Sequence, residues 1–378
     1  MNDHNVENLV GHLFISDTLG YRFTHSLEHI TKGRYAVDFE SIKSTSGTYM
    51  ANKYDITHGE AGAVKEYVGS NIKPLTEEDI SFHEQALDNK NRMNNDRVGM
   101  NSKQMGGKNL KLSHSALKQL SDFDTKVKTY MSHNKGASWN LIDAPLKDVH
   151  GRTLHCYQSD GACSLHLHMY SNNDLGYAPP YSNEASVGVV LAVGNTGNYL
   201  DTKKGAAVGT YLSRDGGIKW SQIAEIPLIY DISDHGALLV AAPNTQATTQ
   251  IRYSWNEGKT WTKLKVSAEP IWVENIISTY ESVTQNFILY GTYDKTTESK
   301  KAKMDKKDGD KNTDSERGGD IMINLDFSGL HTRKCKGADA PGTDKSDFEL
   351  WSPHDDERYQ AHSHKCHMGQ SVTYVRRK

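Results

Sequence analysis

One eight-residue pattern recurs along the chain and constrains its fold more than any other feature. It places Ser first, Gly fifth and an aromatic residue eighth, and its copies lie at 16–23, 132–139, 213–220 and 254–261. The glycines stand at positions 20, 136, 217 and 258, so the steps between them are 116, 81 and 41 residues. These steps are close to three, two and one multiples of about 40, and a period of about 40 to 45 residues is typical of β-propeller blades.

The residue types in this pattern are those of a tight turn followed by a buried aromatic side chain. Asn or Asp at the third place accepts hydrogen bonds from backbone N–H groups of its own turn. Gly at the fifth place supplies a positive φ angle without steric cost, and the aromatic residue forms a small local core. We therefore predict a structural role for these residues: Ser132, Asn134, Gly136, Trp139, Ser213, Asp215, Gly217, Trp220, Ser254, Asn256, Gly258 and Trp261. The copy at 16–23 is weaker, because Thr18 takes the third place.

The pattern resembles the Asp-box, S-x-D-x-G-x-T-W, which recurs in sialidases, sortilin-type receptors and other propellers and marks the hairpin between the last two strands of a blade. Strand-like segments bounded by Gly, Pro, Asn or Asp fit between the copies. They span 187–194, 237–242, 271–278, 286–293 and 320–327. The sequence therefore predicts an all-β fold, a partial β-propeller with Asp-box blades of about 40 residues.

Two polar segments interrupt this β-pattern. Residues 60–124 are predicted as a polar insertion with a helix at 76–87, where Thr76 is the N-cap. Residues 294–319 mix lysines and acids with almost no apolar side chains, so they cannot offset the entropy lost on ordering and are predicted as a mobile loop inside a hairpin. Because acids interleave with its lysines, a nuclear-localisation role is not favoured for this loop.

Charge and motif content exclude several classes of function. A net charge of −3 gives no field that attracts nucleic acid or an anionic membrane, and the apolar runs are too short for a membrane span. The N-terminus shows no signal-peptide pattern. A glycoside hydrolase needs paired carboxylates or a cluster of arginines, but Arg152, Arg214, Arg252 and Arg333 are scattered. Since nucleophile, zinc-protease and phosphate-loop motifs are also missing, we predict a non-catalytic protein without a cofactor.

Three longer stretches carry a more specific resemblance. They are 156–171 (CYQSDGACSLHLHMYS), 186–200 (SVGVVLAVGNTGNYL) and 325–378, which ends in CHMGQSVTYVRRK. Together they resemble the sortilin family, and within it the vacuolar sorting receptors. The resemblance implies a ten-bladed propeller followed by a cysteine-rich module, on the lumenal side of a single-pass receptor that cycles between late Golgi and endosome.

This resemblance also sets the expected organisation and function. Residues 1–327 resemble the C-terminal five to seven blades of one propeller, and 328–378 the start of a truncated cysteine-rich module. The implied role is non-catalytic binding of protein or peptide cargo, such as vacuolar hydrolase precursors, within the Golgi, endosome and vacuole system, with release on acidification. Two alternatives stay open: a glycosidase-like Asp-box propeller enzyme, and an inactive truncated paralogue.

The four cysteines and a C-terminal histidine cluster are further candidates for a bond or a metal site. The resemblance implies a disulfide between Cys156 and Cys163, with two buried thiols as the alternative, and a second disulfide between Cys335 and Cys366. Zinc donors are also present near the C-terminus: His354, His362, His364, Cys366 and His367. Their spacing matches no closed zinc motif, so no metal is predicted.

His166 and His168 alternate along a predicted strand and therefore face the same way. Such a pair suits metal binding, pH sensing near pH 6.5, or packing in a seam between blades. Packing is the favoured interpretation. The two histidines are nevertheless the first candidates for pH-dependent behaviour.

Overall fold

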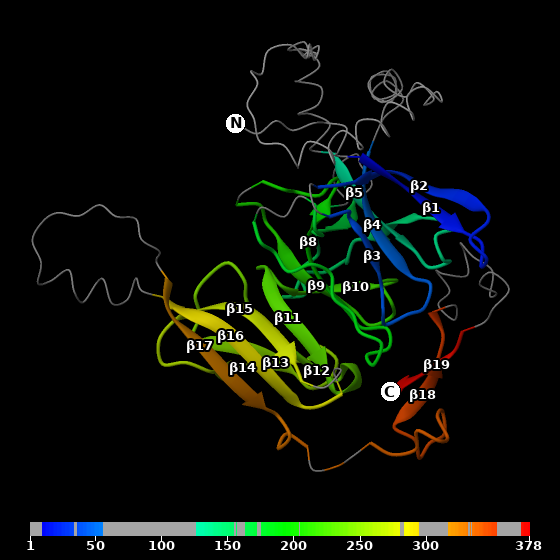
Figure 1. The fold of residues 1–378 in the computed structure, drawn as a ribbon. Helices are drawn as coiled ribbons and strands as arrows, with labels where there is room; N and C mark the ends of the chain where they lie inside the picture. The colour runs from blue at the N-terminus through cyan, green and yellow to red at the C-terminus, as the bar shows by residue number, and fades with distance from the viewer. Residues whose placement is uncertain are drawn as a thin grey trace, which may run out of the picture. The chain divides into compact units, whose positions relative to one another are not determined.

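The computed structural model shows a fold of β-strands joined by turns (Figure 1). It describes residues 10–33, 36–55, 126–154, 156, 163–171, 175–203, 205–279, 283–294, 317–331, 333, 335–353 and 372–378. Contacts between residues divide the chain into two compact units, one of which is Asp55–Lys126. That unit lies almost wholly outside the described residues, as does the helix predicted at 76–87. The fold presented below belongs to the other unit.

The strands pair antiparallel and group into five consecutive blades, numbered here I to V. Blade I comprises β1 (Val10–Ser16) and β2 (Phe23–Thr31). Blade II comprises β3 (Phe39–Ser41), β4 (Tyr49–Tyr54), β5 (Val127–Ser132) and β6 (Asn140–Asp143). Blade III comprises β7 (Ser164–Leu167), β8 (Val190–Gly197), β9 (Gly209–Ser213) and β10 (Trp220–Ala224). Blade IV comprises β11 (Leu228–Ser233), β12 (Leu238–Pro243), β13 (Gln250–Ser254) and β14 (Thr262–Lys265), with the short 3-10 turn η3 (Asp234–Gly236). Blade V comprises β15 (Ile271–Ser278), β16 (Asn286–Asp294) and β17 (Arg317–Asp326).

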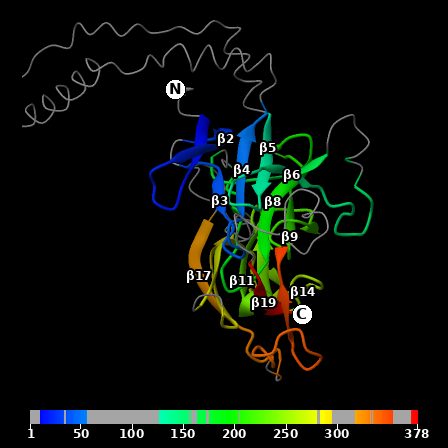
Figure 2. The ribbon, with the colours of Figure 1, turned by 90° about the vertical axis from the view of Figure 1, so that its right-hand side faces the viewer.

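Hydrogen bonding continues across the blade borders in the first half of this fold. Ile30 on β2 pairs with Lys53 on β4, and Ile142 on β6 pairs with Leu165 on β7. Blades I to III therefore form one ten-stranded sheet, in which β4 and β5 run side by side (Figure 2). Blade IV is a separate four-stranded sheet and blade V a three-stranded one. The all-β, partial-propeller prediction is confirmed, with the first three blades joined edge to edge.

The spacing of the octapeptides was wrongly interpreted as a count of blades. The four copies lie in the hairpins β1–β2, β5–β6, β9–β10 and β13–β14, which belong to blades I to IV in turn. Each step of 116, 81 or 41 residues therefore covers a single blade. The first step is lengthened by Asp55–Lys126, and the second by the long connections on either side of β7. Loop length adds little free energy, so it varies between blades while the strands do not.

The predicted strands are found with small shifts at their ends. β15 matches its predicted range, whereas β8 begins and ends three residues later than the predicted segment 187–194. The predicted hairpin around the charged loop is formed by β16 and β17, which pair from Asn286↔Asp326 to Asp294↔Arg317. The two ends of the predicted loop 294–319 are thus strand residues, and 295–316 lie outside the described residues.

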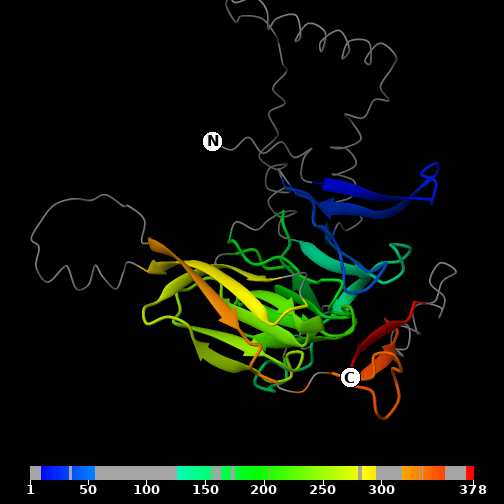
Figure 3. The ribbon, with the colours of Figure 1, turned by 60° about the horizontal axis from the view of Figure 1, so that its bottom comes forward.

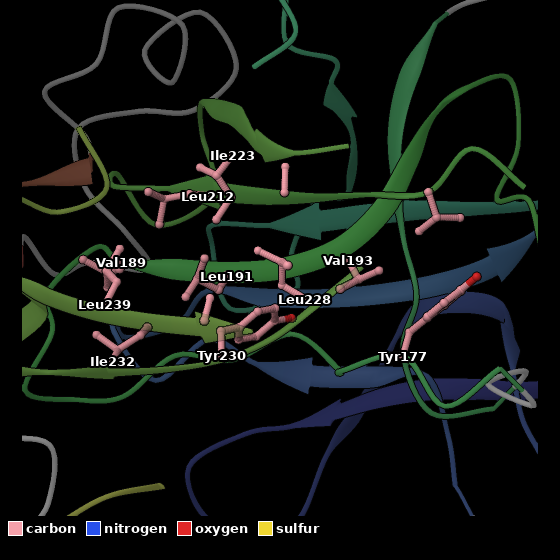
Figure 4. Packing of buried hydrophobic residues seen from close by; sticks show 13 residues of the cluster. Tyr177, Val189, Leu191, Val193, Leu212, Ile223, Leu228, Tyr230, Ile232 and Leu239 are labelled. Atoms are coloured by element: carbon pink, nitrogen blue, oxygen red, sulfur yellow. The ribbon is translucent and has the colours of Figure 1, made fainter. Parts of the chain in front are cut away.

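The core lies between the blades. Alternate residues of one strand face the blade before it and the blade after it. On β8, Leu191 and Val193 pack with Leu228 and Leu239 of blade IV (Figure 4). Their neighbours Val190 and Ala192 face the other way and pack with blade II. Successive side chains of a strand point to opposite faces of the sheet, so a strand buried on both faces is apolar throughout. This is why the run 187–194 contains no charged residue.

A two-stranded hairpin near the C-terminus docks on the loops of blades II to IV. It consists of β18 (Phe348–Trp351) and β19 (Tyr374–Arg377), coloured orange and red in Figure 3. The N–H of Ser46 donates to the hydroxyl of Tyr374 at 2.6 Å, and the Arg376 guanidinium donates to the carbonyl of Arg214 at 3.0 Å. Arg377 lies 3.8 Å from a carboxylate oxygen of Asp234. The hairpin therefore contacts one loop of each of three blades.

Candidate functional site

Three of the octapeptides form the same hydrogen-bonded turn. The fifth-place N–H donates to the hydroxyl of the first-place Ser at 2.8, 2.8 and 2.9 Å in blades II, III and IV. The seventh-place N–H donates to the third-place side-chain oxygen at 2.8, 2.8 and 2.9 Å. The fifth-place glycines have φ of 83, 93 and 77°. In each turn, the Ser hydroxyl and the Asn or Asp side-chain oxygen thus accept backbone N–H groups that would otherwise lack a partner. The Gly allows the left-handed backbone that the turn needs.

The aromatic residues that end the three turns differ in their surroundings. Trp220 is buried, and its Nε1–H donates to the carbonyl of Gly217 at 2.9 Å. Trp139 is half-buried and donates to the hydroxyl of Ser26 on blade I at 3.0 Å. Trp261 packs against the core between blades III and IV, and its Nε1 has no hydrogen-bond partner within the described part of the chain. The Trp side chain of the third turn is therefore held by apolar contact, although the turn itself keeps its hydrogen bonds.

The weak copy in blade I makes its turn with a different residue. The carboxylate of Asp17, at the second place, accepts from the N–H groups of Leu19 at 3.2 Å and Tyr21 at 2.9 Å. Gly20 still has a φ of 73°. Thr18 therefore does not replace the missing third-place acid, because the acid stands one residue earlier.

The glycines of the turns also lie against the preceding blade. A Cβ atom at Gly136 would overlap the side chain of Ile15, one at Gly217 that of Met131, and one at Gly258 that of Leu212. Each of these three apolar residues stands directly before the Ser of the preceding blade's octapeptide. Every turn is thus a socket that receives an apolar knob from the blade before it. We call this contact the knob-and-socket contact.

A second repeated turn was missed by the sequence analysis. Gly47, Gly188 and Gly236 all have positive φ, 73, 78 and 88°, and stand just before the second strand of blades II, III and IV. Carbonyl groups at this turn accept N–H groups of the octapeptide turns, at 2.9 Å for Gly47 and 2.8 Å for Gly188. The available signal is a glycine one to three residues before an apolar run, in TSGTYM, ASVGVV and DHGALL.

His166 and His168 are both buried between blades II and III. His166 lies in β7, where its Nδ1 accepts the N–H of Thr129 at 3.1 Å and its Nε2 donates to the carbonyl of Gly197 at 3.1 Å. This pair of bonds requires the neutral ring with the proton on Nε2. Burial lowers the pKa of His166 to about 4, opposed by the carbonyl of Gly197 and assisted by the charge of Lys128. His166 is therefore uncharged at neutral pH.

His168 follows β7 directly and packs edge-on against Tyr177 with the ring centroids 4.8 Å apart. Its Nε2 is buried without a hydrogen-bond partner among the described residues. Burial lowers the pKa of His168 to about 4, while the charges of Asp201 and Asp38 act in the opposite direction. Both histidines thus stay neutral until the pH is strongly acidic.

The centre of the contact between blades II and III is the carboxylate of Asp38, which sequence analysis did not single out. It is buried and accepts five hydrogen bonds: from the hydroxyl of Thr31, the amide of Asn52, the N–H of Tyr170, and the N–H and hydroxyl of Ser171, at 2.6 to 3.1 Å. A buried charge with this many donors is the arrangement that compensates its desolvation. Asp38 therefore binds the two blades together.

The network continues from Asp38 to the first histidine. The amide of Asn52 also donates to the carbonyl of Leu167 at 3.0 Å, and its oxygen accepts the hydroxyl of Thr129 at 2.6 Å. The N–H of Leu167 donates to that same hydroxyl at 2.8 Å. We call this set the polar seam: Thr31, Asp38, Asn52, Thr129, His166 and Ser171. It is buried, joins blades II and III, and also includes Thr31 at the end of blade I.

One of the two predicted disulfides is present in the structure, and the other involves a cysteine outside the described residues. Cys156 and Cys163 form a disulfide with their Cα atoms 5.5 Å apart, as the resemblance implied. Cys335 is a free, exposed thiol, and Cys366 lies outside the described residues. The bridge between Cys335 and Cys366 therefore stays a prediction, and the histidines around Cys366 also lie outside the description.

The described residues contain no group of three His, Cys, Asp or Glu side chains placed to hold a metal ion. Within the same residues, no helix is long and apolar enough to cross a membrane. The buried carboxylate of Asp38 is occupied by its five donors, and that of Asp231 accepts the N–H groups of Ile232 and Ser278. The buried acids of the described blades thus hold the backbone and neighbouring side chains in place.

Two family models match this chain. The model described as "Sortilin, neurotensin receptor 3" matches residues 77–276, and the model described as "Sortilin, neurotensin receptor 3, C-terminal" matches 278–378. The chain belongs to the sortilin family. The two matches meet near the end of β15, whereas the sequence analysis placed a border at 327/328, so the domain borders of this sortilin-family chain stay a prediction.

Curated relatives in this family carry the name "Vacuolar protein sorting/targeting protein 10". The relative from Aspergillus terreus is 30% identical over 257 residues, which cover 67% of this chain and 16% of the relative. The relative from Debaryomyces hansenii is 30% identical over 253 residues, covering 67% of this chain and 14% of the relative. This sortilin-family chain therefore spans 14 to 16% of the length of these relatives.

One solved structure with a distant likeness is the sialidase NanB from Streptococcus pneumoniae. The two chains share 14% identity with a TM-score of 0.24, over 43% of this chain and 23% of the sialidase. A likeness of this size bears on neither the fold nor the activity.

Proposed function

We propose that this chain is a non-catalytic, cargo-binding part of a vacuolar protein sorting receptor, which carries hydrolase precursors from the Golgi through endosomes to the vacuole. The observation that supports this most is the pair of adjoining family matches over 77–276 and 278–378, together with relatives named for vacuolar protein sorting. The disulfide between Cys156 and Cys163 fits a lumenal location, because disulfides persist in oxidising compartments.

The test is direct binding of cargo to the purified full chain. We expect the immobilised chain to bind the precursor of a vacuolar hydrolase at pH 7.4, and to bind the mature hydrolase without its propeptide much more weakly. A chain with Cys156→Ser and Cys163→Ser, checked for folding by circular dichroism, serves as the matched control for the disulfide. Equal or absent binding of precursor and mature forms would contradict the proposal.

We further propose that acidification weakens cargo binding by destabilising the blades around His166 and His168. Below pH 6.5 the free energy of unfolding falls because His166 and His168 must be charged in the unfolded chain but resist protonation in the folded one. The charged groups facing them are Lys128 for His166, and Asp38 and Asp201 for His168. If binding at pH 5.5 equals binding at pH 7.4, or if His168→Phe leaves the pH dependence unchanged, this part of the proposal is wrong.

A propeller enzyme is the alternative to be tested beside it. A fluorogenic sialoside incubated with the same preparation should show no turnover above the rate of a heat-denatured sample. Turnover that a single Asp or Glu substitution abolishes would instead establish a glycosidase.

A further inference from the structure

Arg252 on β13 is a half-buried cation in the contact between blades III and IV. Its strand partner Ala241 belongs to the apolar cluster between these two blades, so the side chain of Arg252 also points towards blade III. Its Nη1 group donates to the carbonyl of Ile223 at 3.4 Å. This long bond is the one hydrogen bond that the described residues offer to the guanidinium.

No carboxylate of the described residues forms an ion pair with Arg252. Burial lowers the pKa of its guanidinium, and no acid in the described part of the chain acts in the opposite direction. Arg152 on the protein surface is different, because it lies 2.6 Å from Asp148 and 2.5 Å from Glu225. A charge that is partly removed from water without a partner costs free energy, and a bound anion would offset this cost.

The neighbouring strand β14 adds two more cations to the same face. Lys263 stands opposite Arg252, and Lys265 stands opposite Gln250. Cross-strand partners and alternate residues of a strand share a face, so both lysines point to the blade III side of the sheet. Both are exposed. Like charges directly opposite each other destabilise a pair of strands, and an anion bound between them would remove this repulsion.

Two further hydrogen-bond donors lie on this side of the contact. Trp261, two residues before Lys263, packs against the apolar cluster, and its buried Nε1–H has no acceptor among the described residues. Ser221 on β10 pairs with Leu212, which faces blade IV, so its exposed side chain faces blade IV as well. We call this set the cationic rim: Ser221, Arg252, Trp261, Lys263 and Lys265. Each of its side chains can donate a hydrogen bond, and none is negatively charged.

Packing and protection of the sheet edge account for only part of the cationic rim. Lysines on an edge strand such as β14 hinder pairing with another sheet. The aliphatic stem of an arginine also covers apolar surface. Neither role requires a guanidinium to be half-buried directly opposite a lysine, where an uncharged side chain would avoid both the desolvation and the repulsion.

We propose that the cationic rim binds an oxyanion, namely a phosphate or carboxylate group, at the contact between blades III and IV. The planar guanidinium of Arg252 presents its N–H groups as a fork that fits two oxygen atoms of such a group, and Lys263 supplies a second positive charge. Lys265 extends the site towards a ligand with more than one anionic group. This site is separate from the cargo binding proposed above, because that proposal uses none of these residues and either one can fail without the other.

The test is the thermal midpoint of the full chain in increasing sodium phosphate or sodium succinate, each compared with sodium chloride at the same ionic strength. An anion that binds only the folded chain raises the midpoint as its concentration increases. We expect at least one of the two oxyanions to raise it beyond the effect of chloride. An effect of phosphate alone would identify a phosphate-bearing ligand, and an effect of succinate alone a carboxylate-bearing one.

Phosphate also stabilises folded proteins without binding to a site, so the decisive quantity is the difference between the wild type and its variants. Arg252→Met keeps an unbranched apolar stem and removes the charge. We expect the apparent dissociation constant of the effective oxyanion to rise about ten-fold or more in this variant, because hydrogen bonds to a charged group contribute that much. Lys263→Gln should raise the constant about three-fold, as expected for an exposed charge.

The matched control is Lys345→Gln, which removes an exposed lysine in the connection before β18, outside the cationic rim. It should respond to each anion like the wild type. Circular dichroism establishes that each variant is folded. The proposal is overturned if phosphate and succinate shift the wild type no more than chloride does, or if Arg252→Met responds to both oxyanions as fully as Lys345→Gln.

Discussion

The two contacts on either side of blade III are built from opposite kinds of side chain. Towards blade IV, the buried residues are aliphatic and aromatic, with Leu191, Leu228 and Leu239 at the centre. Towards blade II, an apolar cluster is accompanied by the polar seam, in which Asp38 and His166 are fully hydrogen-bonded. The first contact depends on volume and apolar area. The second depends on hydrogen-bond geometry and on the protonation state of its groups. The stability of the second contact therefore responds to pH more than that of the first.

Removal of Asp38 is expected to have the largest effect on this comparison. Asp38→Ala leaves five donors of the polar seam without an acceptor, and breaking a buried charged network of this kind costs about 3 to 5 kcal/mol. The measurement is the free energy of unfolding of the full chain in urea. Asp38→Asn keeps one acceptor oxygen and should lose clearly less. A loss below about 1 kcal/mol for Asp38→Ala would show that the polar seam does not hold the blades together.

Truncation of the apolar contact comes next. Leu239→Ala removes a fully buried side chain between blades III and IV, and such substitutions cost about 2 to 5 kcal/mol. Because the substitution removes no titratable group, the loss should be the same at pH 7.5 and pH 5.5. A loss that changes with pH would contradict the separation between the two contacts.

Acidification of the wild type should weaken the packing around His166 and His168. His166 and His168 have a pKa of about 4 in the folded chain against 6.5 when unfolded, so the unfolded chain binds more protons between these values. Stability is therefore full above pH 6.5 and is lost as the pH falls towards 4, by about 2 kcal/mol per histidine at pH 5. His168→Phe keeps the ring against Tyr177 and removes one titrating group. It should reduce the slope of unfolding free energy against pH by about half, and an unchanged slope would exclude His168 as its source.

Adding a methyl group at the glycine of an octapeptide turn should have a smaller effect on stability, and the effect should depend on whether a side chain of the preceding blade occupies the space. Gly258→Ala adds a methyl group where φ is 77° and the side chain of Leu212 occupies the space, whereas Gly20→Ala meets a similar φ but open space. We expect a loss of about 2 to 3 kcal/mol for Gly258→Ala and about 1 kcal/mol for Gly20→Ala, measured as the free energy of unfolding in urea. Equal losses would mean that backbone strain alone matters at these turns.

The features that the sequence predicted involve residues close together in the chain. The features that it missed depend on residues far apart in the chain. The octapeptide turn closes its hydrogen bonds within seven or eight residues, so Ser254, Asn256 and Gly258 reveal it directly. The apolar runs of β8 and β12 also identify strands buried on both faces. Asp38, by contrast, receives donors from positions 7, 14, 132 and 133 residues away, and no short window of sequence contains them.

The number of blades between octapeptides could not be predicted from their spacing either. A period can be read from a sequence only when loops have similar lengths, and here one blade is interrupted by Asp55–Lys126 while the next has long connections around β7. The candidate histidines were located correctly on and beside a strand. Their neutral state follows from Thr129 and Gly197, which only the fold brings to His166.

The C-terminal hairpin has a consequence for the order in which the chain folds. The hydrogen bond between Ser46 and Tyr374 joins residues 328 positions apart, and Arg376 reaches Arg214 across 162. Contacts at such separations form late in folding, because the long stretch of chain between them must be ordered first. The hairpin can therefore dock only on blades II to IV that are already aligned. A chain with this hairpin in place has therefore aligned these three blades, and the hairpin acts as a latch across them.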